Sequence, residues 1–161
     1  MEPADRPVAT AVLTAAARYG PAVVARIVAL CEADPEREAC GFVLARGEEH
    51  EVVGVPNAAD RHHAASPQLH PRTSRDGYVM DAHVLLEIHR TIDATGARMV
   101  AVWHSHVDGE AVFSDQDRAD ALADSVPVLP GVEYIVVGLR RGHAAEVRAY
   151  RFDGSDYVPA I

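Results

Sequence analysis

The chain has 161 residues, of which 48% are hydrophobic and 24% are charged, and this balance is typical of a globular domain with a buried core. We expect one domain over residues 1–161, with residues 1–20 at its periphery. The formal net charge of −9 argues against binding to nucleic acid or to an anionic membrane surface, because such binding needs a basic face. No apolar run approaches the roughly 20 residues of a membrane-spanning helix.

The two cysteines, Cys31 and Cys40, are too few for the disulfide framework of a small secreted domain. The stretch Met1–Pro7 also lacks the basic start of a secretory signal. We therefore expect reduced thiols and a cytoplasmic protein. Cys40 stands at the head of an apolar run, and we interpret it as a small core residue rather than a nucleophile.

Apolar positions between Val8 and Leu13 show no decisive period, and a strand, a helix and a partly disordered segment all remain open for them. From residue 20 onward the apolar periodicity and the turn residues predict regular elements. In chain order these are a helix over 21–33, a strand in the apolar part of 36–45, a strand over 50–55, a helix over 81–95, a strand over 99–103, a helix from 114 that ends before 125, and strands over 132–139 and 146–152. This order indicates an α/β (α+β) fold, with a mixed β-sheet flanked by helices.

The stretch from His104 to Asp117 follows a predicted buried strand and contains three side chains that bind metal ions in proteins. His104 and His106 are one residue apart on an extended segment, so their imidazoles point to the same side. Asp117 offers a third ligand. Two histidines and one aspartate leave a fourth tetrahedral position free for water, which distinguishes a catalytic zinc site from a closed structural one.

Each part of this pattern also has a purely structural explanation. Histidines at the end of a strand can be polar edge residues. Ser114 and Asp117 have the spacing of a capping box at the start of a helix. The two explanations of Ser114 are compatible, since a hydroxyl that accepts from a helix N–H can still donate its own proton.

The motif His104-x-His106-x7-Ser114-x2-Asp117 resembles the complete motif of the JAMM (JAB/MPN-plus) zinc metalloproteases, in particular their standalone prokaryotic members. The segment Glu38-Ala39-Cys40-Gly41-Phe42 is similar to the family's second catalytic element, a glutamate ahead of a hydrophobic strand. The two matches have the expected order and separation. The resemblance extends over most of the chain from about Pro21, and it implies the JAMM/MPN fold, which is similar to that of cytidine deaminase.

The resemblance also implies roles for the site residues. His104, His106 and Asp117 would bind one Zn²⁺ per chain, and the metal would lower the pKa of its water from about 15.7 toward 7. Glu38 would take a proton from that water and pass it to the leaving amine, and Ser114 would help to stabilise the oxyanion. Glu36, two residues earlier, is a rival for the glutamate, and the Cys-Gly context favours Glu38.

Two features depart from the family pattern. Val107 stands where the family often has proline, so the ligand loop would be braced differently. The segment Asn57–Gly77 is a predicted loop of about twenty residues that carries three of the nine histidines. It would cover the cleft, bind substrate, supply an alternative metal ligand, or lie solvated on the surface. The acidic residues near the motif are candidate second-shell partners or solvated loop acids: Asp108, Glu110 and Asp115.

The implied reaction is the hydrolysis of an amide bond at the C-terminus of a ubiquitin-like protein. The substrate is either a conjugate on a protein target or the C-terminus of a small ubiquitin-like sulfur carrier. We expect the extended tail of this protein to pair with a strand edge formed by 57–77 or its flanking strand. The rival interpretations are a non-catalytic MPN-type scaffold and a zinc hydrolase of a small molecule, such as a deaminase. The missing Pro-Cys-x-x-Cys ligand pair argues against the deaminase.

Overall fold

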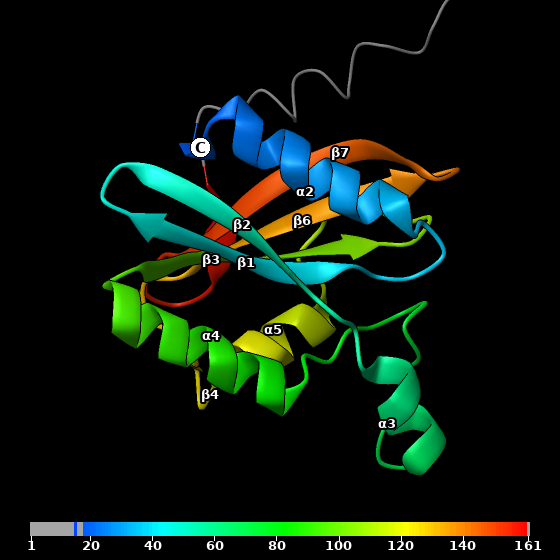
Figure 1. The fold of residues 1–161 in the computed structure, drawn as a ribbon. Coiled ribbons are helices and arrows are strands. Elements are labelled where there is room, and N and C mark those ends of the chain that lie inside the picture. The colour runs from blue at the N-terminus through cyan, green and yellow to red at the C-terminus, as the bar shows by residue number, and fades with distance from the viewer. Residues whose placement is uncertain (1–14, 16–17, 161) are drawn as a thin grey trace, which may run out of the picture.

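The computed structural model describes residue 15 and residues 18–160, and the apolar positions from Val8 to Leu13 lie outside this part of the chain. A six-stranded sheet forms its centre, with α2 on one face and α4 and α5 on the other (Figure 1). The helices are α2 (Pro21–Ala33), α3 (Ala59–Ala65), α4 (Ala82–Thr95) and α5 (Asp115–Ala121). The strands are β1 (Cys40–Arg46), β2 (Glu49–Val55), β3 (Arg98–His106), β4 (Leu122–Ala123), β5 (Val126–Pro127), β6 (Glu133–Arg140), β7 (His143–Phe152) and β8 (Tyr157–Pro159).

The strand order in the sheet is β2-β1-β3-β6-β7-β8, and β4 and β5 form a separate small hairpin. β3 and β6 run parallel, whereas the other neighbours in the sheet are antiparallel. A parallel pair needs a long crossover connection, and here α5 and the β4–β5 hairpin provide it. The mixed α+β fold predicted from the sequence is therefore confirmed.

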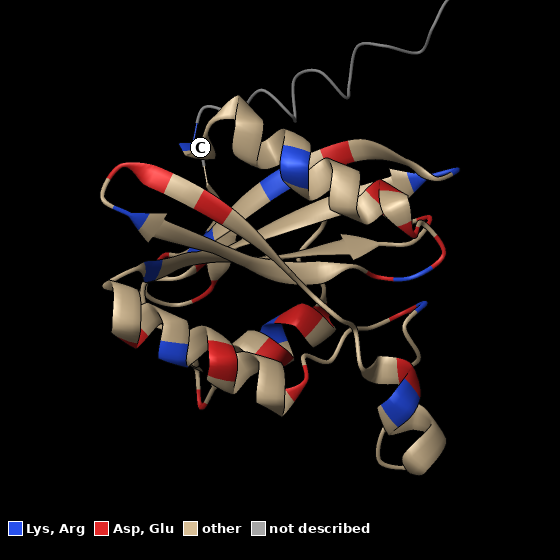
Figure 2. Ribbon diagram, viewed as in Figure 1, with Lys and Arg blue, Asp and Glu red and all other residues tan. Residues whose placement is uncertain are grey.

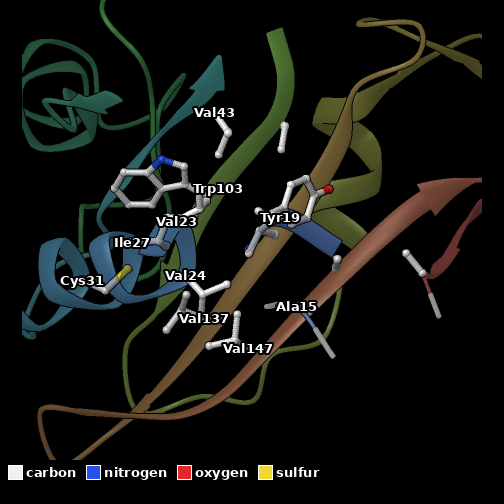
Figure 3. Close-up of a cluster of buried hydrophobic side chains, with 14 of the residues drawn as sticks. Ala15, Tyr19, Val23, Val24, Ile27, Cys31, Val43, Trp103, Val137 and Val147 are labelled. Carbon is white, nitrogen blue, oxygen red and sulfur yellow. The ribbon is translucent and has the colours of Figure 1, made fainter. Parts of the chain in front are cut away.

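Alternation along β3 divides its side chains between two hydrophobic cores. Trp103 packs with Ile27 and Cys31 of α2 on one face (Figure 3). Val102 packs on the opposite face, in the cluster that contains Ile88 of α4. Because side chains alternate along a strand, the even-numbered positions that follow Val102 also face the side of α4 and α5.

The predicted helices and the hairpin of β1 and β2 are confirmed. The strands 99–103 and 146–152 are found with longer bounds, and the strand 132–139 is found one residue later, at the same length. The prediction of an unbroken loop over 57–77 was wrong, since α3 lies within it. This helix is short and polar, and Ala58 provides no side-chain cap, so the sequence carries no start signal. The predicted helix at 114 ends early, because Leu122 already adopts an extended backbone and begins β4.

Acidic and basic residues lie mixed along α4 and α5 (Figure 2). Among the described residues, the helices are all too short or too polar to cross a membrane.

The glycine pair Gly41 and Gly54, opposite each other on β1 and β2, provides a test of the packing. A Cβ on Gly41 would lie 2.0 Å from the Val53 carbonyl oxygen and 2.6 Å from the Trp103 ring, whereas a Cβ on Gly54 would meet only Leu30 at 3.6 Å. We expect Gly41→Ala to lower the free energy of unfolding by at least about 1–3 kcal/mol, through overpacking. Gly54→Ala, the matched control, should change it by less than about 0.5 kcal/mol. Urea denaturation measures both, and equal effects would contradict the close approach of Trp103.

Candidate metal centre

His104 and His106 lie at the end of β3, which is flanked by β1 and β6. They follow Val102 in the strand alternation, so both rings face the side of α4 and α5. Their Nε2 atoms are 3.1 Å apart. His104 is fully buried and His106 is partly exposed. The sequence prediction that the two imidazoles converge is therefore confirmed by the geometry.

Asp117 reaches the two histidines from the first turn of α5. Ser114 is the N-cap of this helix, and its Oγ accepts a hydrogen bond from the Asp117 N–H at 3.0 Å. In return, Asp117 Oδ2 accepts from the Ser114 N–H at 2.9 Å, which completes a capping box. Asp117 Oδ1 lies 3.2 Å from His104 Nε2, and Oδ2 lies 3.3 Å from His106 Nε2. The cap thus directs the carboxylate toward the histidine pair.

The spacing of these donor atoms fits a tetrahedral metal ion. Zinc with ligands at 2.0–2.2 Å in tetrahedral geometry places the ligand atoms about 3.3–3.6 Å apart. The distances between Nε2 of His104, Nε2 of His106 and the Asp117 oxygens are 3.1–3.3 Å. Within residue 15 and residues 18–160, this is the one group of three His, Cys, Asp or Glu side chains whose ligand atoms lie within 4.8 Å of one another.

The electrostatics of His104 and Asp117 favour the protonation states that bind metal. Burial opposes the charged form of His106, but its hydrogen bond with Asp117 and other contacts outweigh this effect, so the pKa of His106 is raised. Burial lowers the pKa of His104, which keeps its imidazole neutral. Burial opposes ionisation of Asp117, but hydrogen bonds with His104 and His106 outweigh it and hold the pKa of this carboxyl well below its usual range. A neutral histidine and an ionised carboxylate are the forms that bind metal ions.

The other ring nitrogens of the histidines are held differently. His106 Nδ1 lies 2.8 Å from the Glu110 carbonyl oxygen, and donation to this oxygen leaves Nε2 free as the ligand atom. His104 Nδ1 is buried and finds no partner in the described part of the chain. Instead, the Tyr78 ring stacks on the His104 ring, with centroids 4.7 Å apart. No local pattern in the sequence predicts the position of Tyr78.

Glu38 joins the site from the segment just before β1. Cys40 pairs with His104 in the antiparallel register of β1 and β3. The Ala39 carbonyl accepts from the Ser105 N–H, and the Ala39 N–H donates to the Ser105 hydroxyl. Continued by one more step, this register brings Glu38 level with His106. The side chain of Glu38 is only 7% exposed, and burial raises its pKa to about 8, with Asp117 adding to the shift and His106 opposing it. A carboxyl with this pKa can exchange a proton near neutral pH.

Glu36, the rival glutamate, points away from the centre. Its side chain is 75% exposed and pairs with Arg75 at 2.7 Å. The structure therefore favours Glu38. Ser105, between the two histidines, lies on the opposite face of β3, where its Oγ accepts from the Ala39 N–H at 2.9 Å.

The loop that follows His106 is braced without a proline at Val107. A Cβ on Gly138 of β6 would lie 2.7 Å from the Gly109 carbonyl oxygen, so the loop backbone rests directly on this strand. The Ala111 N–H donates to Glu146 Oε2 at 3.1 Å, and the Tyr150 hydroxyl donates to the Ala111 carbonyl at 2.6 Å. β6 and β7 thus replace the expected proline as the support of the ligand loop.

The acidic residues near the motif have different places. Asp108 accepts from the Arg141 N–H at 3.2 Å and lies 3.7 Å from the Arg75 guanidinium. Glu110 contributes its backbone carbonyl to His106, as described above. Asp115 is exposed on α5. Of these three acidic residues, Glu110 is the one that hydrogen-bonds a proposed ligand within the described part of the chain, and it does so through its main chain.

The histidines of the segment 57–77 are not gathered at the centre. The rings of His62 and His70 meet edge to face, with centroids 5.0 Å apart, and His63 Nδ1 lies 2.8 Å from the His70 carbonyl oxygen. None of them belongs to the group of three metal-binding side chains found in the described residues. The expectation of an alternative metal ligand from this segment therefore finds no support.

A cavity of about 680 Å³ lies beside the centre, between the sheet, α4, α5 and the segment that follows α3. Tyr78, which stacks on His104, forms part of its wall, as do Gln116 and Asp120 on either side of Asp117. Leu69 and Val128 also line it and are 79% and 53% exposed, which places apolar side chains on both the cavity and the surface. The cavity therefore offers an apolar compartment next to the candidate metal centre.

Comparisons with known proteins find relatives in sequence and in fold. A CysO-cysteine peptidase of Mycobacterium tuberculosis is 28% identical over 134 residues, which are 83% of this chain and 81% of that protein, and the protein of the same name from Mycobacterium bovis matches equally well. A solution structure from Desulfitobacterium hafniense has a TM-score of 0.62 at 17% identity, with 86% of each chain covered. One from Salinibacter ruber has a TM-score of 0.52 at 18% identity and covers 87% of this chain and 85% of its own.

Residues 20–153 match the family of prokaryotic homologs of the JAB domain, and this match covers well over half of the sequence. It spans both elements of the resemblance, the glutamate segment before β1 and the motif from His104 to Asp117. The resemblance stated from the sequence is thereby confirmed at the level of the family. The chain belongs to the prokaryotic homologs of the JAB domain.

Proposed function

We propose that this protein is a zinc-dependent peptidase that hydrolyses an amide bond at the C-terminus of a ubiquitin-like protein. The observation that carries the proposal is the convergence of His104, His106 and Asp117, whose nearest nitrogen and oxygen atoms are 3.1–3.3 Å apart, with the buried Glu38 close to His106 and Asp117. A non-catalytic scaffold would have no use for an acidic side chain buried next to such a group, because burying an ionisable group is costly.

His104, His106 and Asp117 would hold one zinc ion. Zinc bound there supplies a Lewis acid for the scissile carbonyl and lowers the pKa of water toward 7. The neutral state of His104 and the ionised state of Asp117 prepare the site for the metal before it arrives.

Glu38 and Ser114 have separate roles in the proposed reaction. Glu38 takes a proton from the attacking water and transfers it to the leaving amine, and its pKa near 8 suits both steps. The Ser114 Oγ already accepts the Asp117 N–H, so its own proton remains available for the oxyanion of the tetrahedral intermediate.

The names of the mycobacterial relatives favour one of the two substrate versions. They are peptidases of a CysO–cysteine species, and CysO-type sulfur carriers match the second version, in which material is released from a carrier's C-terminus. We therefore propose a small ubiquitin-like sulfur carrier as the partner. Removal of a ubiquitin-like protein from a protein target is the alternative, since the same centre would serve an isopeptide bond.

The tail of such a partner must lie extended to reach the centre. β2 is an edge strand of the sheet, and its last residue, Val55, pairs with Cys40 close to Glu38. We propose that this edge guides the tail by strand pairing. The cavity beside Tyr78 would then receive an apolar side chain of the tail.

The chemistry is tested with Glu38→Gln and the matched variant Glu36→Gln, in the zinc-loaded protein. The probe is a ubiquitin-like sulfur carrier with one cysteine in amide linkage after its C-terminal glycine, and mass spectrometry follows the loss of that cysteine. We expect Glu38→Gln to lower kcat by roughly 10²–10⁴-fold. Glu36→Gln should stay within about twofold, because an exposed ion pair contributes little.

Equal activity of the wild type and Glu38→Gln would rule out the proposed role of Glu38. A zinc-loaded wild type that cleaves neither this probe nor an isopeptide-linked conjugate would favour the scaffold.

The cavity is tested with two valines of similar exposure that lie two residues apart. Val128 lines the cavity, whereas Val126, which is 59% exposed, does not. We expect Val128→Trp to raise KM for the same probe by about tenfold, because the larger ring occludes the apolar compartment. The value of kcat should stay within about twofold, and Val126→Trp should change neither constant. An unchanged KM in Val128→Trp would show that the tail does not use the cavity.

A further inference from the structure

The main chain of Glu38 is held by a segment far from it in the sequence. The registered pairs of β1 begin at Cys40, and the Ala39 carbonyl still accepts from the Ser105 N–H, but Glu38 lies beyond these contacts. Its N–H donates to the Ser74 carbonyl at 2.6 Å, and its carbonyl accepts from Asn57 Nδ2 at 2.8 Å. Both backbone groups of the proposed general base are therefore bound by the segment that contains α3.

Asn57 uses the full hydrogen-bonding capacity of its side chain. Nδ2 donates to the carbonyls of Glu38 and Gly77, at 2.8 and 2.9 Å. Oδ1 accepts from the N–H groups of Ala59 and Val79, at 3.0 and 3.1 Å. Both Nδ2 partners are carbonyls and both Oδ1 partners are N–H groups, so only one orientation of the amide satisfies all four. The side chain connects Glu38 to the start of α3 and to the residues on both sides of Tyr78.

Ser74 is fixed by a second connection. It is only 4% exposed, and Asp60 of α3 accepts from both its N–H and its hydroxyl, at 2.8 and 2.7 Å. α3 thus supports the Ser74 carbonyl that binds the Glu38 N–H. The polar segment predicted as a plain loop forms two hydrogen-bonded supports for a single residue.

We propose that Asn57 is a positioning residue for Glu38: together with the Ser74 carbonyl, it fixes the main chain from which the carboxylate reaches the metal centre. This inference rests on the proposed role of Glu38. A proton-transferring group must be held within a fraction of an ångström of its productive position, and small misplacements lower the rate rather than the affinity for substrate. Deleting the segment around α3 would remove Ser74, so a deletion cannot separate this role from tail binding, and point variants are required.

The first variant is Asn57→Asp in the zinc-loaded protein. It has the same shape and keeps the acceptor toward Ala59 and Val79, but it turns an oxygen toward the carbonyls of Glu38 and Gly77. We expect kcat for the cysteine-extended carrier probe to fall about 10- to 100-fold, with KM and zinc content within about twofold of the wild type. His63→Ala, in the same segment without a contact to Glu38, is the control and should keep the wild-type kcat.

A double-variant cycle with Glu38→Gln, under single-turnover conditions, shows whether Asn57 acts through Glu38. If it does, Asn57→Asp should lower the residual rate of Glu38→Gln by less than about twofold, because the group that it positions is already disabled. A general structural role would lower the rate in both backgrounds alike. Asp60→Ala is the substitute if Asn57→Asp does not fold. This change, at an exposed position, removes the hydrogen bonds that hold Ser74, and its effect on kcat should show the same dependence on Glu38.

The outcomes separate this inference from the proposed function. If Glu38→Gln itself keeps the wild-type kcat, the role of Glu38 is wrong and the inference falls with it. If Glu38→Gln is impaired but Asn57→Asp and Asp60→Ala keep the wild-type kcat, the positioning role alone is wrong. Equal losses from Asn57→Asp in the wild-type and Glu38→Gln backgrounds would also overturn it.

Discussion

The candidate centre depends on one reciprocal interaction, the capping box between Ser114 and Asp117. The box starts α5, and it also turns the Asp117 carboxylate toward the end of β3. There, strand alternation has already placed His104 and His106 on the same face. The start of α5 and the end of β3 thus bring the Asp117 carboxylate and the two imidazoles together.

The sheet topology explains how the candidate metal centre is supported. β3 lies between β1 and β6, and the crossover from β3 to β6 contains α5. The ligand loop rests on Gly138 of β6, and Trp103 closes the opposite face against α2. The polar groups of the site are therefore held by strands in a packed core, with the metal-binding atoms aimed toward the face that also contains the cavity.

Local patterns in the sequence predicted the parts of the site that local geometry determines. The period of a strand predicts that His104 and His106 converge, and the spacing of Ser114 and Asp117 predicts the cap. The hydrophobic periodicity likewise predicted α2, α4 and the main strands. These predictions succeeded because each depends on residues that are close in the chain.

The remaining parts depend on contacts between distant residues. Asn57 and Ser74 are ordinary polar residues in the sequence, and only the fold brings them to the main chain of Glu38. α3 is short and polar, and its N-cap residue Ala58 has no capping side chain. The Ala59 N–H is instead bound by Asn57, the residue before Ala58, so the usual N-cap pattern does not mark the helix. The position of Tyr78 over His104 follows from the path of this same segment. The sequence therefore predicts the site residues better than it predicts the residues that support them.

Zinc content measures the central claim most directly. Mass spectrometry of the metal, after zinc loading and removal of excess, should give one zinc per chain for the wild type. Asp117→Asn keeps an acceptor for the helix cap but loses the anionic ligand, and it should lose most of the zinc. Asp115→Asn, at the exposed neighbouring position, should keep it. A wild type that binds no zinc, or an Asp117→Asn variant that binds it as well as the wild type, would contradict the account.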